Sequence, residues 1–121
     1  MGKKYLKRVG LLLQRKITQL LLEQSNDPRL SLITITDVIP NRDTTRAEVY
    51  YSMIGDPEER MEVQAALDGA ASWLRAELAP TLRLRQVPEL VFIYDPSLEH
   101  GQRIDTLLNQ LQEEGQLPDD E

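Results

Sequence analysis

The sequence predicts one α+β domain in which a three-stranded sheet is covered on one face by helices. Three patterns indicate this: apolar residues recur at helical spacing near the amino end, two short central segments alternate apolar with polar residues, and a third such segment follows a second helical stretch. The length of 121 residues is typical of a single domain. Elements with one apolar face must bury it against each other, which gives a two-layer arrangement.

The first predicted element is a helix over residues 5–24. Its apolar residues stand three and four positions apart and form one stripe: Leu6, Val9, Leu13, Ile17, Leu20 and Leu21. Lysines and arginines occupy other positions. The helix is expected to end at Asn26-Asp27-Pro28, because proline disfavours helical backbone in the residue before it and Asn and Asp favour turns.

Two strands joined by a hairpin turn are predicted next. Residues 32–39 are rich in Ile, Thr and Val, and residues 47–53 alternate apolar and polar side chains. Between them, Pro40-Asn41-Arg42-Asp43 has the composition of a tight turn. The second strand therefore has one apolar and one polar face, which fits a sheet covered on a single side.

The second helical stretch is predicted to begin at Asp56. Asp56 is a suitable N-cap, Pro57 suits the first helical position, and Glu59 stands three residues after the cap. The apolar pattern continues until Pro80. Midway, the weak helix formers within residues 68–72 predict a bend or a break, so we expect a kinked helix.

A third strand is predicted over residues 90–94, and Pro88 restricts its start to a position compatible with a sheet edge. Residues 103–112 are expected to form a short last helix. We therefore expect a folded domain, residues 1–112, followed by an acidic flexible tail, residues 113–121. The order helix, strand, strand, kinked helix, strand matches the type II KH arrangement.

Composition excludes several classes of function. No cysteine is present, so disulfides, thiolate nucleophiles and cysteine-ligated metals are ruled out, and the composition fits the cytoplasm. The longest apolar runs are too short to cross a bilayer. The basic amino end leads directly into an amphipathic pattern with no cleavage site, which argues against a secretory signal.

Residues suited to catalysis are scarce. The chain has no glycine-rich phosphate loop and no nucleophile elbow, and its single histidine, His100, lies in a predicted turn. Asp95, Glu99 and Asp105 could converge on a magnesium ion, as in a nuclease, although such acidic runs are more often solvated surface. The sequence thus predicts a non-catalytic protein without a cofactor. A metal-dependent ribonuclease and an RNA-independent protein-interaction module stay open as alternatives.

Charge is distributed unevenly along the chain, whose formal net charge is -6. Residues 1–16 contain six basic residues and no acidic one, whereas residues 89–121 contain nine acidic residues and one arginine. Because phosphate binding draws mainly on Lys and Arg, the basic clusters predict RNA contact. The arginines proposed for this contact are Arg8, Arg42, Arg46, Arg75, Arg83 and Arg85.

One pair of arginines supports this prediction, and one alternative stands beside it. In Arg83-Leu84-Arg85 the two guanidiniums would project to one side of an extended segment and grip phosphates bidentately. The alternative for any single arginine is an ordinary surface position paired with a nearby carboxylate. Among the aromatic residues, Tyr50 on the polar face of the second strand is the best candidate for base stacking, whereas Trp73 is expected to pack against the core.

Many residues in order resemble the ribosome-binding factor A family of bacterial small-subunit assembly factors. The resemblance runs along nearly the whole domain. In the first half it is carried by Arg8-Val9, Asp27-Pro28-Arg29-Leu30, Val38, Arg42-Asp43, Ala47 and Val49-Tyr50. In the second half it is carried by Leu74-Arg75, Leu82-Arg83-Leu84-Arg85, Val87-Pro88-Glu89-Leu90, Phe92, Tyr94-Asp95, Ser97, Gly101, Arg103-Ile104 and Leu107-Leu108.

The resemblance implies a fold, a site and a role. The family is similar to type II KH domains, with an Ala-x-Gly kink in place of their Gly-x-x-Gly loop; here the kink reads Ala70-Ala71-Ser72, which the resemblance places in the RNA contact. It further implies a monomer that binds the free small (30S) ribosomal subunit and 16S rRNA late in assembly and assists processing of the rRNA 5′ end. Assembly GTPases act in the same pathway.

Overall fold

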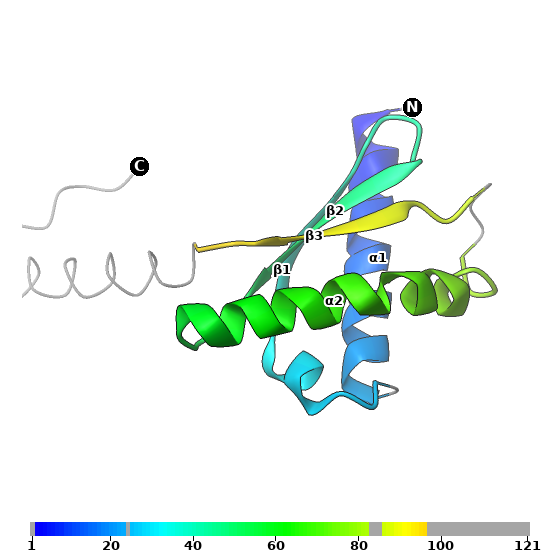
Figure 1. Ribbon diagram of the computed structural model, residues 1–121. Coiled ribbons are helices and arrows are strands. Elements are labelled where there is room, and N and C mark those ends of the chain that lie inside the picture. Colours follow the sequence, from blue (N-terminus) through cyan, green and yellow to red (C-terminus); the bar gives the residue numbers. More distant parts are fainter. Residues whose placement is uncertain (1, 24, 83–85, 97–121) are drawn as a thin grey trace, which may run out of the picture.

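The computed structural model describes residues 2–23, 25–82 and 86–96, which form one α+β domain (Figure 1). Its elements are α1 (Lys3–Glu23), the 3₁₀ helix η1 (Pro28–Leu32), β1 (Thr34–Pro40), β2 (Arg46–Ser52), α2 (Pro57–Leu78) and β3 (Glu89–Tyr94). The predicted first helix and the three predicted strands are confirmed within a few residues. The short helix η1, capped by the Asp27 side chain, was not predicted. The predicted last helix lies outside the described residues.

The three strands form one mixed sheet in the order β1-β2-β3. β1 and β2 are antiparallel, with Val38 opposite Val49, while β3 runs parallel to β2, with Phe92 beside Val49. Central β2 is therefore hydrogen-bonded on both sides, and β3 is an edge strand, as the position of Pro88 predicted. A register shift between Ile35 and Asp37 marks a bulge in β1.

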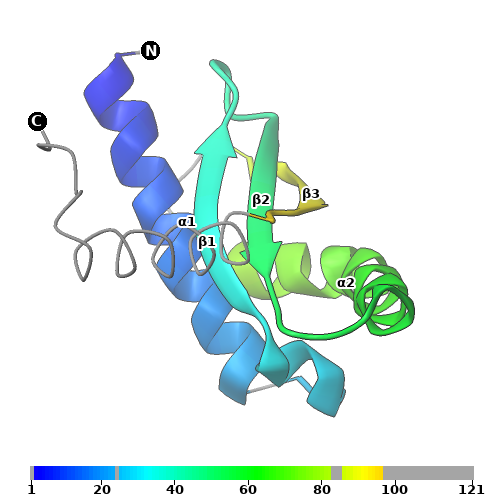
Figure 2. The same cartoon turned by 90° about the vertical axis from the view of Figure 1, so that its left-hand side faces the viewer.

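Helices α1 and α2 cover the same face of the sheet and share one core with it (Figures 1 and 2). The predicted apolar face of β2 is confirmed, since alternate residues of that strand are completely buried. The largest fully buried apolar side chains of the sheet and the two helices are Val49, Tyr51, Leu13, Ile17, Leu67, Leu74 and Leu78. One buried face explains why the polar residues of β2 lie on the other side.

The start of α2 follows the predicted signal closely. The Asp56 side chain accepts a hydrogen bond from the Glu59 backbone nitrogen at 2.8 Å, and the Glu59 carboxylate accepts one from the Asp56 nitrogen at 3.1 Å. This reciprocal capping box satisfies two backbone donors that the first helical turn leaves without partners.

Of the two outcomes predicted for the second stretch, a break is wrong, because Pro57–Leu78 is one continuous α-helix. Breaking a helix favours a residue with positive φ, which serine adopts at a cost that glycine avoids. Among the described non-glycine residues, Thr44 in the hairpin has a positive φ, and Ser72 does not. Ala70, Ala71 and Ser72 therefore continue the helix. Its axis changes direction in the second half, so the helix is bent without being broken (Figure 2).

The position of α1 along β1 depends on a very close backbone approach at Gly10. A Cβ atom placed on Gly10 would lie 2.5 Å from the carbonyl oxygen of Val38, closer than real Cβ contacts allow. One turn further on, the Gln14 side-chain amide donates a hydrogen bond of 3.0 Å to the Ile35 carbonyl oxygen. Together these contacts fix the register of α1 against the sheet.

A second network attaches α2 to the sheet. The Tyr51 hydroxyl donates to the Gln64 side-chain oxygen, and the Gln64 amide donates to the Phe92 carbonyl oxygen at 2.9 Å. The rings of Tyr51 and Tyr94 make an edge contact with centroids 5.7 Å apart. Burial raises the pKa of Tyr51, so its hydroxyl stays a donor at neutral pH. The network thereby ties β2, α2 and β3 together.

Gly10→Ala is expected to lower the free energy of unfolding by about 1–3 kcal/mol, because the added methyl group must push α1 away from β1. Gly69→Ala is the matched control: no atom lies within 4 Å of an added Cβ there, so the change should stabilise α2 by about 0.5–1 kcal/mol. Urea denaturation of the two variants checks both signs. A Gly10→Ala variant as stable as wild type would contradict the close approach.

Candidate nucleic-acid interface

Several elements begin or end on one side of the domain. The hairpin joins β1 to β2 there, β3 begins beside β2 with Glu89 paired to Arg46, and α2 returns to the same side to reach β3. The amino terminus of α1 lies next to the hairpin (Figure 1). We call this surface the basic end and define it by Lys3, Lys4, Lys7, Arg8, Arg42 and Arg46, all of which are exposed.

Four cations occupy the first turns of α1, and the first turn contains no acidic residue. The amino terminus of a helix carries a partial positive charge, so each cation there is disfavoured by roughly 0.3–1 kcal/mol at low ionic strength. The same arrangement creates a positive potential next to free backbone N–H groups, which attracts phosphate. A charge pattern that weakens the helix and strengthens anion binding indicates a functional surface.

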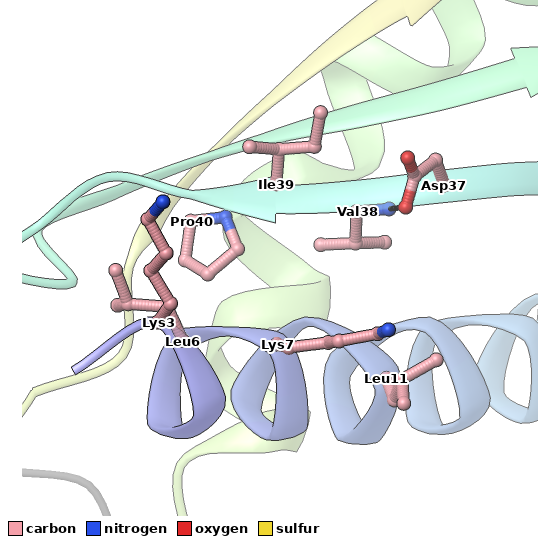
Figure 3. A pocket seen from close by; sticks show the side chains of 8 residues that line it. All are labelled: Lys3, Leu6, Lys7, Leu11, Asp37, Val38, Ile39 and Pro40. Atoms are coloured by element: carbon pink, nitrogen blue, oxygen red, sulfur yellow. Dashed lines mark hydrogen bonds between the residues drawn. The ribbon is translucent and has the colours of Figure 1, made fainter.

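A groove of about 360 Å³ separates the start of α1 from the outer edge of β1 (Figure 3). Lys3 and Lys7 stand along it, one turn apart, while Leu6, Val38 and Pro40 supply apolar walls. Asp37 adds one carboxylate to the two ammonium groups. This combination places ammonium groups beside an apolar surface. It suits a ligand with anionic groups on a partly apolar body, such as a nucleotide.

The hairpin that carries Arg42 and Arg46 is held by its own side chains. The Asn41 side-chain oxygen accepts from the Arg46 nitrogen at 3.0 Å, and Asp43 accepts from the Thr45 hydroxyl at 2.7 Å and from the Thr45 nitrogen at 3.2 Å. These hydrogen bonds, the one from the hydroxyl above all, hold the pKa of Asp43 below its ordinary value. The loop backbone is therefore fixed while both arginine side chains are exposed.

The predicted arginines differ in their surroundings. Within the described residues the recorded ion pair joins Arg29 to Asp27 at 2.6 Å, and Arg8, Arg42 and Arg46 pair with no carboxylate there. The alternative for each arginine was an ion pair with a nearby carboxylate, and the described structure shows no such pair for these three. Arg75 is exposed but donates to the Val87 carbonyl oxygen at 2.9 Å, which also gives it a structural role.

Of the remaining predicted residues, two are not described and three lie apart from this surface. Arg83 and Arg85 lie outside the described residues, so their assignment stays a prediction. Ala70, Ala71 and Ser72 lie on α2; Ala70 and Ala71 are half-buried against the core and Ser72 is exposed. Ala70 lines a separate groove beside the carboxyl end of α1. The structure thus divides the predicted site between two places.

Sequence reasoning missed this second groove, which has a volume of about 310 Å³. It is lined by Ser25, Asn26, Asp27, Leu30, Ala66, Gly69, Ala70 and Trp73. The signal that could have found one wall is a row of small residues on α2 at spacings of three and four, ending in Trp73. The opposite wall comes from the α1–β1 connection, which local sequence does not place there.

The face of the sheet that the described helices leave open carries several carboxylates. The Tyr50 hydroxyl donates to the Glu48 carboxylate at 3.0 Å, and the Thr36 hydroxyl donates to the Asp95 carboxylate at 2.8 Å. Hydrogen bonding to Glu48 and the charges of Asp37 and Asp95 raise the pKa of Tyr50. Carboxylates repel phosphate, so Tyr50 is poorly placed for the base stacking that the sequence suggested.

The magnesium-site alternative can be tested only in part. Within residues 2–23, 25–82 and 86–96, no three His, Cys, Asp or Glu side chains come together as a metal site. Glu99, His100 and Asp105 lie outside these residues. None of the helices in the described part of the chain is long and apolar enough to span a membrane.

The element order and the helices on one sheet face define a KH-like α+β fold, and the basic end marks it as a candidate for nucleic-acid binding. The profile of the family described as ribosome-binding factor A matches residues 5–108. The chain belongs to this family.

Relatives and solved structures agree with this assignment. The ribosome-binding factor A of Heliobacterium modesticaldum is 44% identical over 83% of this chain and 83% of its own length, and that of Halothermothrix orenii is 38% identical over 89% and 88%. The crystal structure of ribosome-binding factor A from Thermus thermophilus matches with a TM-score of 0.64 and 30% identity, covering 78% of this chain and 97% of that one.

A further match is a homology model of the Thermus thermophilus factor fitted into a cryo-EM map of a complex of that factor with 30S. It has a TM-score of 0.59 and 29% identity, and covers 72% of this chain and 91% of that one. The small-subunit complex is thus described for a structural neighbour of the same family.

Asp43→Asn removes a carboxyl group whose pKa is lowered in the folded state. The stability that the ionised carboxylate contributes is therefore present above the unfolded pKa of about 3.9, and it is lost as pH falls through the folded pKa. We expect the variant to be less stable than wild type at pH 6 and the difference to disappear towards pH 2–3. Thermal melts across this range check the prediction. A difference that does not change with pH would show that the charge has no part in the hairpin.

Proposed function

We propose that this protein is a ribosome assembly factor that binds the free small (30S) subunit through 16S rRNA during late maturation and assists processing of the rRNA 5′ end. The observation that carries the proposal is the basic end, where Arg8, Arg42 and Arg46 are exposed without carboxylate partners in the described structure. Membership of the ribosome-binding factor A family and the 30S complex described for the Thermus thermophilus factor support it.

The binding mechanism we propose is electrostatic docking on a pre-formed surface. The Asn41–Arg46 hydrogen bonds hold the hairpin, and the Gly10 contact holds α1 beside it, so the cations need little reorganisation on binding. Each phosphate contact releases counterions, which gives affinity that falls steeply with salt. Arg75, and Arg83 with Arg85, would extend this surface towards the start of β3.

The net charge of -6 is compatible with RNA binding because cations predominate locally at the basic end. Within the described residues, Asp95 follows the far end of β3, whereas Asp37 lines the groove beside Lys3 and Lys7 and Glu48 lies near Arg46. The six cations of the basic end outnumber these neighbouring carboxylates. Such an arrangement repels RNA from the acidic face and turns the basic end towards it. We expect this charge distribution to improve the orientation and selectivity of RNA binding more than its affinity.

Other parts of the proposal follow from the family and the composition. The protein acts as a cytoplasmic monomer without cofactor or catalytic activity, and assembly GTPases act on the same subunit. Residues 1–112 form the KH-like RNA-binding unit, and residues 113–121 form an acidic tail. Ala70, Ala71 and Ser72 contribute a second RNA contact on α2.

Arg42→Gln with Arg46→Gln should weaken co-sedimentation with small subunits by at least about tenfold at 0.1 M salt and reduce the log-log salt slope by about 1.5, because two phosphate contacts are lost. Arg15→Gln with Lys16→Gln removes the same charge from the far half of α1 and serves as the matched control. Equal losses in both variants would mean that overall charge, and not the basic end, determines binding.

Purified protein incubated with precursor 16S rRNA and magnesium should leave the RNA intact, because binding without catalysis is proposed. Gel analysis of the RNA ends, with and without chelator, checks this. Cleavage that needs magnesium and stops with chelator, and that Asp95→Asn abolishes, would establish the nuclease alternative instead.

A further inference from the structure

The second groove lies between one face of α2 and the connection from α1 to β1. Its α2 wall consists of Ala66, Gly69 and Ala70, followed one turn later by Trp73. The facing wall is the segment from Ser25 to Leu30. With a volume of about 310 Å³, the groove matches the lower end of small-molecule sites, which span roughly 300–1,000 Å³.

The space exists because the α2 wall has no large aliphatic side chain. An added Cβ at Gly69 would meet no atom within 4 Å, whereas the inward-facing positions Leu67 and Leu74 of the same helix are completely buried. Buried Leu30 contributes an apolar part of the lining. An open groove between two packed segments is a site for a flat, compact group.

The side chains around the groove have distinct chemistry. Trp73 is half-buried and packs against the core while also lining the groove, so part of its indole is available to a ligand. Asn26 is exposed, and its amide makes no hydrogen bond to the described residues. An amide offers two donors and an acceptor, the groups that pair with a base edge.

The acidic residue of the groove is already neutralised. Asp27 accepts hydrogen bonds from the Arg29 side chain at 2.6, 2.9 and 3.2 Å, and this pairing lowers the pKa of Asp27. The guanidinium of Arg29 remains half-exposed beside the groove. An anionic ligand would therefore meet a carboxylate that is paired with its own half-exposed cation, and not a free negative charge.

We propose that this groove binds one unstacked nucleobase of single-stranded RNA, stacked on Trp73 and hydrogen-bonded by Asn26, with the adjoining phosphate near Arg29. The inference rests on the proposed function and adds to it a base-binding site apart from the basic end. It also gives Trp73 a role in addition to packing. Stacking of one base is worth roughly 5- to 150-fold in affinity, enough to discriminate single-stranded from paired RNA at this position.

Trp73 is the only tryptophan in the chain, so its fluorescence reports on this groove alone. Titration with tetraadenylate and tetrauridylate should quench the emission saturably, whereas inorganic polyphosphate of equal charge should not. Gly69→Leu fills the groove at a position with open space and should weaken the quenching at least fivefold. Ala65→Leu adds the same side chain at an exposed position of α2 outside the groove and should leave it unchanged.

Asn26→Ala gives a second test that leaves both the groove and its reporter in place. It should weaken binding of a labelled tetranucleotide, measured by anisotropy. Equal binding by wild type and Gly69→Leu, or equal quenching by polyphosphate, would overturn the base site. If wild type co-sediments with small subunits but no tetranucleotide quenches Trp73, the base site is wrong and the proposed function stands. If neither binding is seen, the proposed function itself fails.

Discussion

The structure depends on the contact between the α1 backbone at Gly10 and the carbonyl oxygen of Val38. The Cβ of any side chain at Gly10 would lie 2.5 Å from that oxygen, too close for a real contact, so the helix can lie this close to β1 only with glycine there. The Gln14 hydrogen bond to Ile35 sets the same register one turn later. The amino terminus of α1 is consequently held beside the hairpin, and this brings the cations of two distant sequence segments onto one surface.

That surface shows how an acidic protein can bind RNA. The cations at the start of α1 oppose the helix dipole, and the hairpin arginines have no carboxylate partners in the described structure, so neither group is arranged for stability of the fold. Of the carboxylates on the open sheet face, Asp95 lies at the opposite end of β3 from the hairpin, whereas Glu48 lies near Arg46. Because cations are concentrated at one end, the domain has an electric dipole. The negative potential of RNA orients this dipole with the basic end towards the RNA.

The sequence predicts the elements well because their signals are local. The apolar stripe of α1, the alternation in β2 and the Asp56 cap each depend on neighbouring residues. The predicted break in α2 failed because Ser72 keeps helical backbone where a glycine could leave it cheaply. Low helix propensity alone does not end a helix when the residues before and after the weak segment are packed against the core.

Site residues were harder to predict because they depend on contacts between distant segments. The bond from Arg75 to Val87 and the groove between Trp73 and the α1–β1 connection have no local signal. Charge clusters drew attention to Arg42, which is exposed, but gave no sign of its separation from Ala70. Whether a surface arginine is available to contact RNA depends on its ion pairs and its burial, and both depend on the fold.

Site-specific photocrosslinking on the small subunit tests the central claim most directly. A benzophenone side chain placed at Lys4, at the start of α1, should crosslink to 16S rRNA, whereas one placed at Tyr50, on the acidic face, should not. Both positions are accessible enough to carry the probe without disturbing the core. Crosslinks to rRNA from position 50 and none from position 4 would contradict the account, because they would place the acidic face, and not the basic end, on the RNA.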